Sequence, residues 1–184
     1  MDERDYFTED ELKKILSYDE WKSHEHRLWL QLMYCFGLTV QELTNLKVKD
    51  IDFDSMVLKV YSSRRSKPRI LNIPKVIQLD LRKEALGKYS EDHLFQGRKG
   101  AVHKRTVQKV MERVFKKFGI YATVSKFRKT FALHSIRYGW DEKSIAMALG
   151  HSSIRATRLL MGKDRIYFER KKSHPIDHIL RIKL

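Results

Sequence analysis

The side chains of this chain that are best suited to chemistry are cationic and lie far apart in the sequence. Arg128 stands between Lys126 and Lys129, and Lys67 lies in a basic turn over residues 62–68. A guanidinium group is planar and donates two parallel hydrogen bonds, which matches the oxygens of a phosphate. The alternative for an arginine among lysines is a solvated helix face.

His151 follows a glycine near the end of the chain. The run around it is Leu149-Gly150-His151-Ser152-Ser153-Ile154-Arg155-Ala156-Thr157. The imidazole either contacts a ligand or satisfies the turn after the glycine, and the sequence favours neither. The other histidines considered have no partners at metal-ligand spacing, so we expect no metal and no cofactor. They are His103, His134, His174 and His178.

The charge of the chain predicts a polyanionic partner. The net charge is +15 and the pI is about 9.9. Residues 1–20 carry eight acidic and three basic side chains, whereas residues 98–129 carry eleven basic and one acidic. Such asymmetry favours a directed nucleic-acid-binding face over a generically basic protein.

The composition also narrows the class of protein. The single cysteine, Cys35, lies in an apolar run and is expected to be a buried hydrophobe, so neither a disulfide nor a zinc cluster is expected. No apolar stretch approaches the about 20 residues that span a bilayer, and the acidic N-terminus has no signal-peptide pattern. We expect an intracellular protein, in the cytoplasm or nucleoid, with no membrane association.

These candidates require a mostly helical scaffold to position them. Capping boxes at Thr8 and Thr39 predict two helix starts, and Gly37 suits a helix end. Ser125 is a further candidate N-cap. The expected helices are a short one through Ile15, one over 28–36, one after Thr39, one after Pro74, and those near 103–118, 126–138, 141–149, 152–162 and 175–182.

The helix near 103–118 is amphipathic, with apolar residues on one stripe and mainly basic residues on the rest. Residues 50–61, chiefly 56–61, and residues 69–73 read as short strands that flank the basic turn. The predicted fold class is therefore mostly α with one small antiparallel β-sheet, α+β. The predicted apolar stripe consists of Val107, Val110, Met111, Val114, Phe115 and Phe118.

Four segments, in order, resemble the catalytic domain of the tyrosine recombinase (phage integrase) family. We call residues 36–47 the first box and residues 125–132 the second box. The first resembles Thr-Gly-Leu-Arg-Ile-Ser-Glu-Leu-x-x-Leu, and the second resembles His-x-Leu-Arg-His-Thr-Phe-Ala. The strand pair is similar to the family's β-hairpin, and residues 139–151 match its following helix pair. Residues 149–157 resemble its Leu-Gly-His-Ser-Ser-Ile-x-x-Thr signature.

The resemblance implies a known chemistry. In the family a tyrosine attacks a DNA phosphodiester, two arginines hold the phosphate oxygens, a hairpin lysine protonates the leaving oxygen, and two histidines position protons. The resemblance assigns Lys67, Arg128 and His151 to retained positions, where phosphate binding is favoured over catalysis.

Three positions depart from the family pattern. The first-box arginine is Thr39, the second-box histidine is Ser125, and the tyrosine is Leu160, nine residues after the histidine. Capping explains the first two, and helix packing explains the leucine. Tyr167 is an alternative nucleophile, for which ordinary packing is the simpler interpretation.

The leading hypothesis is a DNA-binding protein on a recombinase fold without catalysis. A divergent active recombinase that uses Tyr167 is the first alternative, and a protein- or RNA-interaction module is the second. The expected DNA contacts are Arg64, Arg65, Lys67, Lys104, Arg105, Lys109, Lys126, Arg128, Lys129, His151 and Arg155.

The predicted organisation is one catalytic-type domain over residues 1–184, with the family's N-terminal clamp domain absent. The expected partner is double-stranded DNA. The helix at 175–182 either packs on its own core or docks on an active recombinase or on a second copy of the chain.

Overall fold

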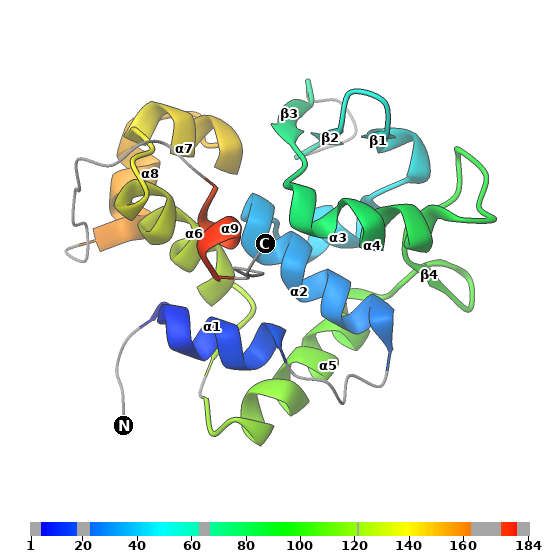
Figure 1. Ribbon diagram of the computed structural model, residues 1–184, viewed down its shortest axis with the longest axis horizontal. Coiled ribbons are helices and arrows are strands. Elements are labelled where there is room, and N and C mark those ends of the chain that lie inside the picture. Colours follow the sequence, from blue (N-terminus) through cyan, green and yellow to red (C-terminus); the bar gives the residue numbers. More distant parts are fainter. Residues whose placement is uncertain (1–4, 18–22, 63–66, 121, 163–173, 180–184) are drawn as a thin grey trace.

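The computed structural model describes residues 5–17, 23–62, 67–120, 122–162 and 174–179. Most described residues are helical, as expected (Figure 1). The helices are α1 (Glu9–Leu16), α2 (His24–Phe36), α3 (Val40–Asn45), the 3₁₀ turn η1 (Val48–Asp50), α4 (Lys75–Ala85), α5 (Lys104–Lys117), α6 (Lys126–Arg137), α7 (Glu142–Leu149), α8 (Ile154–Met161) and α9 (Pro175–Ile179).

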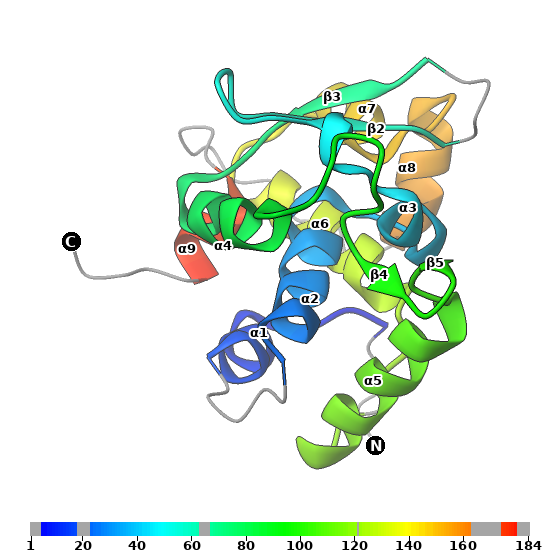
Figure 2. The same ribbon diagram turned by 90° about the vertical axis from the view of Figure 1, so that its right-hand side faces the viewer.

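The sheet expected from the sequence is present, and the predicted strand region 50–61 forms two strands, β1 (Ile51–Asp52) and β2 (Val57–Val60), instead of one. The order of the sheet is β1, β2 and β3 (Arg69–Asn72), all antiparallel. A second short hairpin, β4 (Gln96–Gly97) with β5 (Gly100–Ala101), was not predicted, because two-residue strands leave no alternating pattern. In Figure 2, β3 runs beside α7, and the two elements are in contact.

The helix α2 is the centre of the hydrophobic core. Every residue from Leu28 to Phe36 is buried, and the helix packs on α1, α3, α4, α5, α6 and α9. Cys35 is buried and free, as predicted. A helix that is apolar on all sides belongs inside a domain. A second cluster, around Phe131 and Leu149, joins α6, α7 and α8.

Local sequence signals confirm several helix boundaries. Thr8 and Thr39 both form complete capping boxes, with Glu11 and Glu42 respectively. Gly37 ends α2 in the left-handed conformation, with φ of 57°. The predicted stripe of α5 faces the core.

The C-terminal helix packs on its own core over the residues described. Ile176 and Ile179 are buried among residues of the main cluster, and α9 contacts α1, α2 and α6. The rest of the predicted apolar stripe, Leu180 and Ile182, lies outside the described residues. In the part of the chain that the structure describes, no helix has the length and apolar character that a bilayer span requires.

Candidate functional site

The site is organised around the turn between α7 and α8. The helix α7 ends at Gly150, whose φ is 67°, and His151 follows. The last carbonyls of a helix lack intrahelical partners and carry partial negative charge. The carbonyl oxygens of Ala148 and Leu149 therefore offer two adjacent positions for cations, directly before the histidine.

Arg128 occupies one of these positions. Its Nη2 donates to the Leu149 carbonyl at 2.5 Å, and its Nη1 donates to the Gly37 carbonyl at 2.7 Å. The guanidinium thus joins the first box to the end of α7. A Cβ at Gly37 would lie 2.4 Å from a methyl carbon of Leu149, and φ at Gly37 is 57°, so both the conformation and this contact between the first box and the end of α7 favour glycine. Burial lowers the pKa of Arg128 from its ordinary value; Glu42 opposes that shift and Arg69 adds to it.

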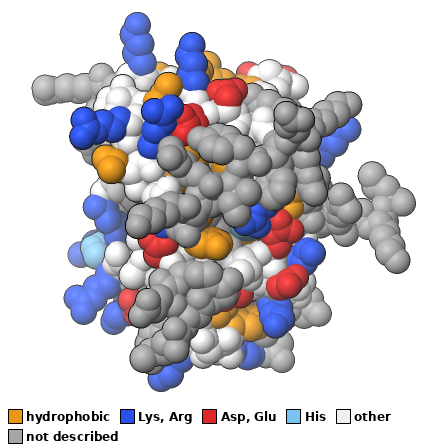
Figure 3. Space-filling view, turned by 90° about the vertical axis from the view of Figure 1, so that its left-hand side faces the viewer, with side chains coloured by type: hydrophobic (Ala, Val, Ile, Leu, Met, Phe, Trp, Pro, Cys, Tyr) orange, Lys and Arg blue, Asp and Glu red, His pale blue; other side chains and the backbone are white. Residues whose placement is uncertain are grey.

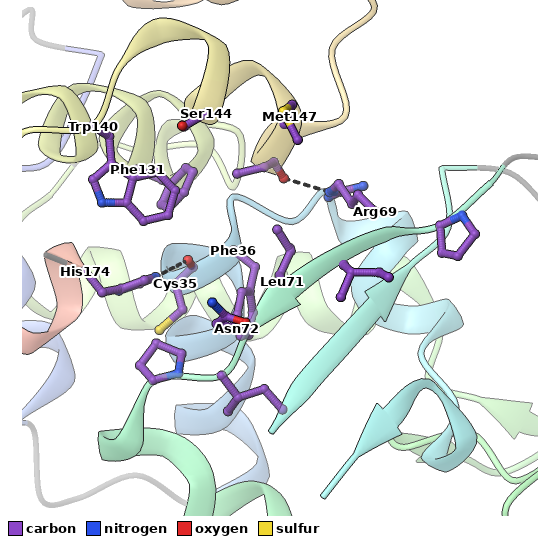
Figure 4. Close-up of a pocket in the computed structure, with 15 residues that line it drawn as sticks. Cys35, Phe36, Arg69, Leu71, Asn72, Phe131, Trp140, Ser144, Met147 and His174 are labelled. Carbon is purple, nitrogen blue, oxygen red and sulfur yellow. Dashed lines mark hydrogen bonds between the residues drawn. The ribbon is translucent and has the colours of Figure 1, made fainter. Parts of the chain in front are cut away.

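Arg69 occupies the other position and was not among the residues expected from the sequence. Its Nε donates to the Ala148 carbonyl at 2.7 Å, a bond drawn in Figure 4. Its Nη1 donates to Glu42 at 2.6 Å, and the side chain is 9% exposed. The sequence signal was weak: Arg69 lies two residues after Lys67 on the strand that leaves the basic turn.

Glu42, in the first box, is the carboxylate that both arginines share. It lies 2.6 Å from Arg69 Nη1 and 3.9 Å from Arg128 Nη1. Its Oε2 also accepts the backbone N–H of Thr39 at 2.9 Å. Burial raises the pKa of Glu42, but the hydrogen bond and charge of Arg69, the Thr39 amide and the charge of Arg128 outweigh it, so the pKa is lowered overall.

His151 joins the same group. Its Nδ1 is 2.8 Å from the hydroxyl of Thr157, a fully buried residue of α8. Burial, and then the charges of Arg128 and Arg69, lower the pKa of His151, while Glu42 acts in the opposite direction. The lowered pKa favours the neutral imidazole, and the Thr157 hydroxyl holds one of its two ring nitrogens.

A cleft of about 360 Å³ lies beside Arg128. Thr39 and Ser125, two of the three departures from the family pattern, both line it, and Gln108 and Glu112 of α5 line it as well. Thr39 caps α3, as predicted. Ser125 occupies the N-cap position of α6, as predicted, but its hydroxyl makes no capping hydrogen bond and pairs instead with the hydroxyl of Thr123 at 2.7 Å.

A larger cleft of about 770 Å³ lies between β3, α6 and α7 and is lined mainly by apolar side chains (Figure 4). Arg69 borders it, and in Figure 4 the Arg69 side chain extends from β3 toward the end of α7. Arg69 lines this larger cleft, whereas Arg128 and His151 do not.

The lysines of α6 do not join the group. Lys126 and Lys129 are each 8% exposed. The ammonium of Lys126 lies 5.0 Å from the centre of the Phe7 ring, and that of Lys129 lies 2.5 Å from Asp5. Both point to the N-terminal segment, so we leave them out of the candidate DNA surface.

Other expected contact residues are exposed. Lys67 precedes β3, Lys104, Arg105 and Lys109 lie on α5, and Arg155 lies in the first turn of α8. Leu160 is partly buried against the second core cluster, which agrees with its predicted packing role. Arg64, Arg65 and Tyr167 lie outside the described residues.

A comparison with known proteins agrees with the family that the order of the sequence boxes predicts. A model of the phage integrase family matches residues 5–161. The chain belongs to this family. Its fold is that of the tyrosine recombinase catalytic domain: the crystal structure of XerA recombinase superposes with a TM-score of 0.74 at 26% identity, covering 85% of this chain and 60% of that one.

Relatives are tyrosine recombinases. XerA of Pyrococcus horikoshii is 32% identical over 157 residues, and XerA of Thermococcus kodakarensis is 33% identical over 157 residues. Each match covers 83% of this chain, but only 54% and 56% of the respective relative. The chain thus spans about half the length of these relatives. XerH recombinase bound to its difH substrate has the same fold, with a TM-score of 0.72 at 21% identity, covering 86% of this chain and 50% of that one.

Proposed function

We propose that this chain binds double-stranded DNA through the Arg128–His151 site and does not cleave it. The observation that carries the proposal is the set of side chains around that site. Arg128 and His151 are kept and lie close together, whereas Thr39 and Ser125 line the adjacent cleft with short, uncharged side chains.

The missing groups remove the covalent route. A tyrosine recombinase needs a nucleophile, and Leu160, at the family position, has no group that can attack phosphorus. Loss of one preorganised donor to a developing charge costs about 10²–10³ in rate, by analogy with an oxyanion hole. Thr39 in place of the first-box arginine adds a loss of this size, because the hydroxyl and the backbone amide of Thr39 are both hydrogen bonded to Glu42.

Binding itself needs only phosphate contacts. The net charge is +15, and exposed basic residues lie on α5, on α8 and before β3. Figure 3 views the side of the molecule that α7 and α8 occupy in Figure 1 and shows Lys and Arg side chains along its margins. Contacts of this kind give affinities of roughly 10⁻⁴–10⁻⁶ M at physiological salt, with little sequence preference.

A cleavage assay tests the proposal. End-labelled linear duplexes and supercoiled plasmids, both carrying a library of random inserts, are incubated with the protein. Denaturing gels of the linear duplexes are scored for covalent adduct, and agarose gels of the plasmids are scored for relaxation. A native gel on the same mixtures measures binding. We expect shifted DNA without adduct or relaxation.

Two results would contradict this expectation. Adduct or relaxation that disappears in Tyr167→Phe would identify a displaced nucleophile and an active enzyme. Absence of any shift at low salt would rule out DNA binding, and a shift that Arg128→Gln leaves unchanged would rule out binding through this site.

A further inference from the structure

We propose that Arg69 is the second phosphate-contacting arginine of this site and supplies from β3 the guanidinium that the first box lacks. The inference rests on the proposed DNA binding. It concerns a residue outside both boxes, on a strand where only the nearby Lys67 hinted at such a role.

The position of Arg69 fits this role. Its Nη1 hydrogen bonds to Glu42, three residues after Thr39, so the guanidinium is attached to the first box from outside. A Cβ built on Gly150 would lie 3.2 Å from the same Nη1. The guanidinium therefore packs against the backbone directly before His151.

The two arginines form an adjacent pair. Arg69 and Arg128 bind consecutive carbonyls at the end of α7, Ala148 and Leu149, and share the carboxylate of Glu42. With His151 neutral, two guanidinium charges face one carboxylate, which leaves one positive charge uncompensated within the group. A bound phosphodiester carries the one negative charge that would balance it.

Arg69 also has a donor without a partner. Nε and Nη1 are hydrogen bonded, but Nη2 is buried and has no hydrogen-bond partner among the described residues. Buried polar groups in folded proteins are almost always satisfied, so an orphaned one calls for an explanation. A purely structural role, tying β3 to α3 and α7, is already fulfilled by Nε and Nη1. Phosphate oxygens would accept from Nη2.

Thr39 cannot take this role. It is exposed, lacks a positive charge, and its side chain caps α3 through Glu42. An arginine that reaches the same glutamate from β3 provides the guanidinium from another part of the chain.

The test measures the salt dependence of binding to a 30-base-pair duplex by fluorescence anisotropy. One lost phosphate contact lowers the slope of log K against log salt by about 0.9. We expect this change in Arg69→Gln. The ratio of unchanged to variant affinity should then be about 3.5-fold larger at 50 mM than at 200 mM salt.

Two further variants test whether a change in slope comes from a lost phosphate contact at Arg69 and not from a change in net charge or a loss of folding. The double variant Glu42→Gln with Arg69→Gln removes both members of the pair, so the net charge is unchanged and no carboxylate stays buried without its arginine. Its slope should still fall by about 0.9. The matched control is Arg82→Gln: Arg82 also donates to a backbone carbonyl, that of Phe53, but lies on α4, which is far from α8 in Figures 1 and 2. The control should retain the slope of the unchanged protein.

The outcomes are distinguishable. If the double variant folds, as judged by circular dichroism, and keeps the slope and affinity of the unchanged protein, Arg69 is a structural residue. The inference about Arg69 then fails, while the proposed DNA binding stands. If the unchanged protein shows no salt-dependent binding to the duplex, the proposed function fails instead.

Discussion

Replacement of Glu42 by glutamine tests whether one carboxylate holds both guanidinium groups in place. Glu42 is 6% exposed, 2.6 Å from Arg69 and 3.9 Å from Arg128. Removal of one partner from a buried ion pair costs about 3–5 kcal/mol, because the remaining charge stays buried. We expect Glu42→Gln to lower the free energy of unfolding by that amount, a large part of the roughly 5–15 kcal/mol that a domain has.

Urea unfolding measures this loss, followed by circular dichroism and tryptophan fluorescence. For an m-value of about 2 kcal/mol/M, the midpoint should fall by about 1.5–2.5 M. The matched control is Glu91→Gln, which removes a carboxylate that pairs with Lys47 and Lys49 on the surface. Its midpoint should stay within experimental error of the unchanged protein.

Anions provide a second measurement on the same variant. Two guanidinium groups without their carboxylate should bind inorganic phosphate, which stabilises the folded state by mass action. Phosphate should therefore raise the midpoint of Glu42→Gln more than that of the unchanged protein, relative to chloride at equal ionic strength. A midpoint shift no larger than that of the Glu91→Gln control would refute the shared-carboxylate reasoning.

Three further predictions follow from the same contacts. Gly150→Ala should lower the free energy of unfolding by about 1–2 kcal/mol, because φ is 67°, and should weaken DNA binding measured by anisotropy. The control Gly87→Ala, with φ of 76° and no neighbour within 4 Å, should lower the free energy of unfolding without a change in DNA binding. Equal DNA binding by the two variants would contradict this prediction. Arg128→Lys should destabilise by about 1–3 kcal/mol and weaken binding, because an ammonium cannot bridge two carbonyls as a fork does; full binding would contradict it. Burial lowers the pKa of His134 and of His174 to about 4, so the unfolded state binds more protons than the folded state between pH 6.5 and 4. The free energy of unfolding should be full above pH 6.5 and fall below it, with a slope that approaches about 2.7 kcal/mol per pH unit. Urea unfolding at pH 7, 6 and 5 measures this slope, and an equal free energy of unfolding at all three pH values would contradict the prediction.

Sequence patterns were informative wherever the deciding interactions are local. The capping boxes at Thr8 and Thr39 each act within four residues, and the end of α2 depends on the backbone freedom of one glycine, Gly37. The stripe of α5 was readable because that helix has one apolar face and one charged face. The order of the boxes likewise predicted that Arg128 and His151 belong to one site, and in the structure the two side chains lie close enough for the charge of Arg128 to lower the pKa of His151.

The same reasoning failed on α6, because that helix is buried on nearly all sides. Periodicity does not indicate which neighbour each side chain meets in such a helix. Lys126 and Lys129 look like part of a basic surface in the sequence, but Phe7 and Asp5, more than 100 residues earlier, determine their positions.

The sequence by itself predicted most of the helices, the capping boxes at Thr8 and Thr39, the family, and Arg128 and His151 as candidate site residues, since these follow from short-range rules and ordered motifs. Only the tertiary structure brings Arg69 to this candidate site. Its partners are Glu42, 27 residues before it, and Ala148, 79 residues after it. No local rule links residues at such separations: packing of β3 against α3 and α7 brings them together, and the low exposure of the site makes their charges interact strongly.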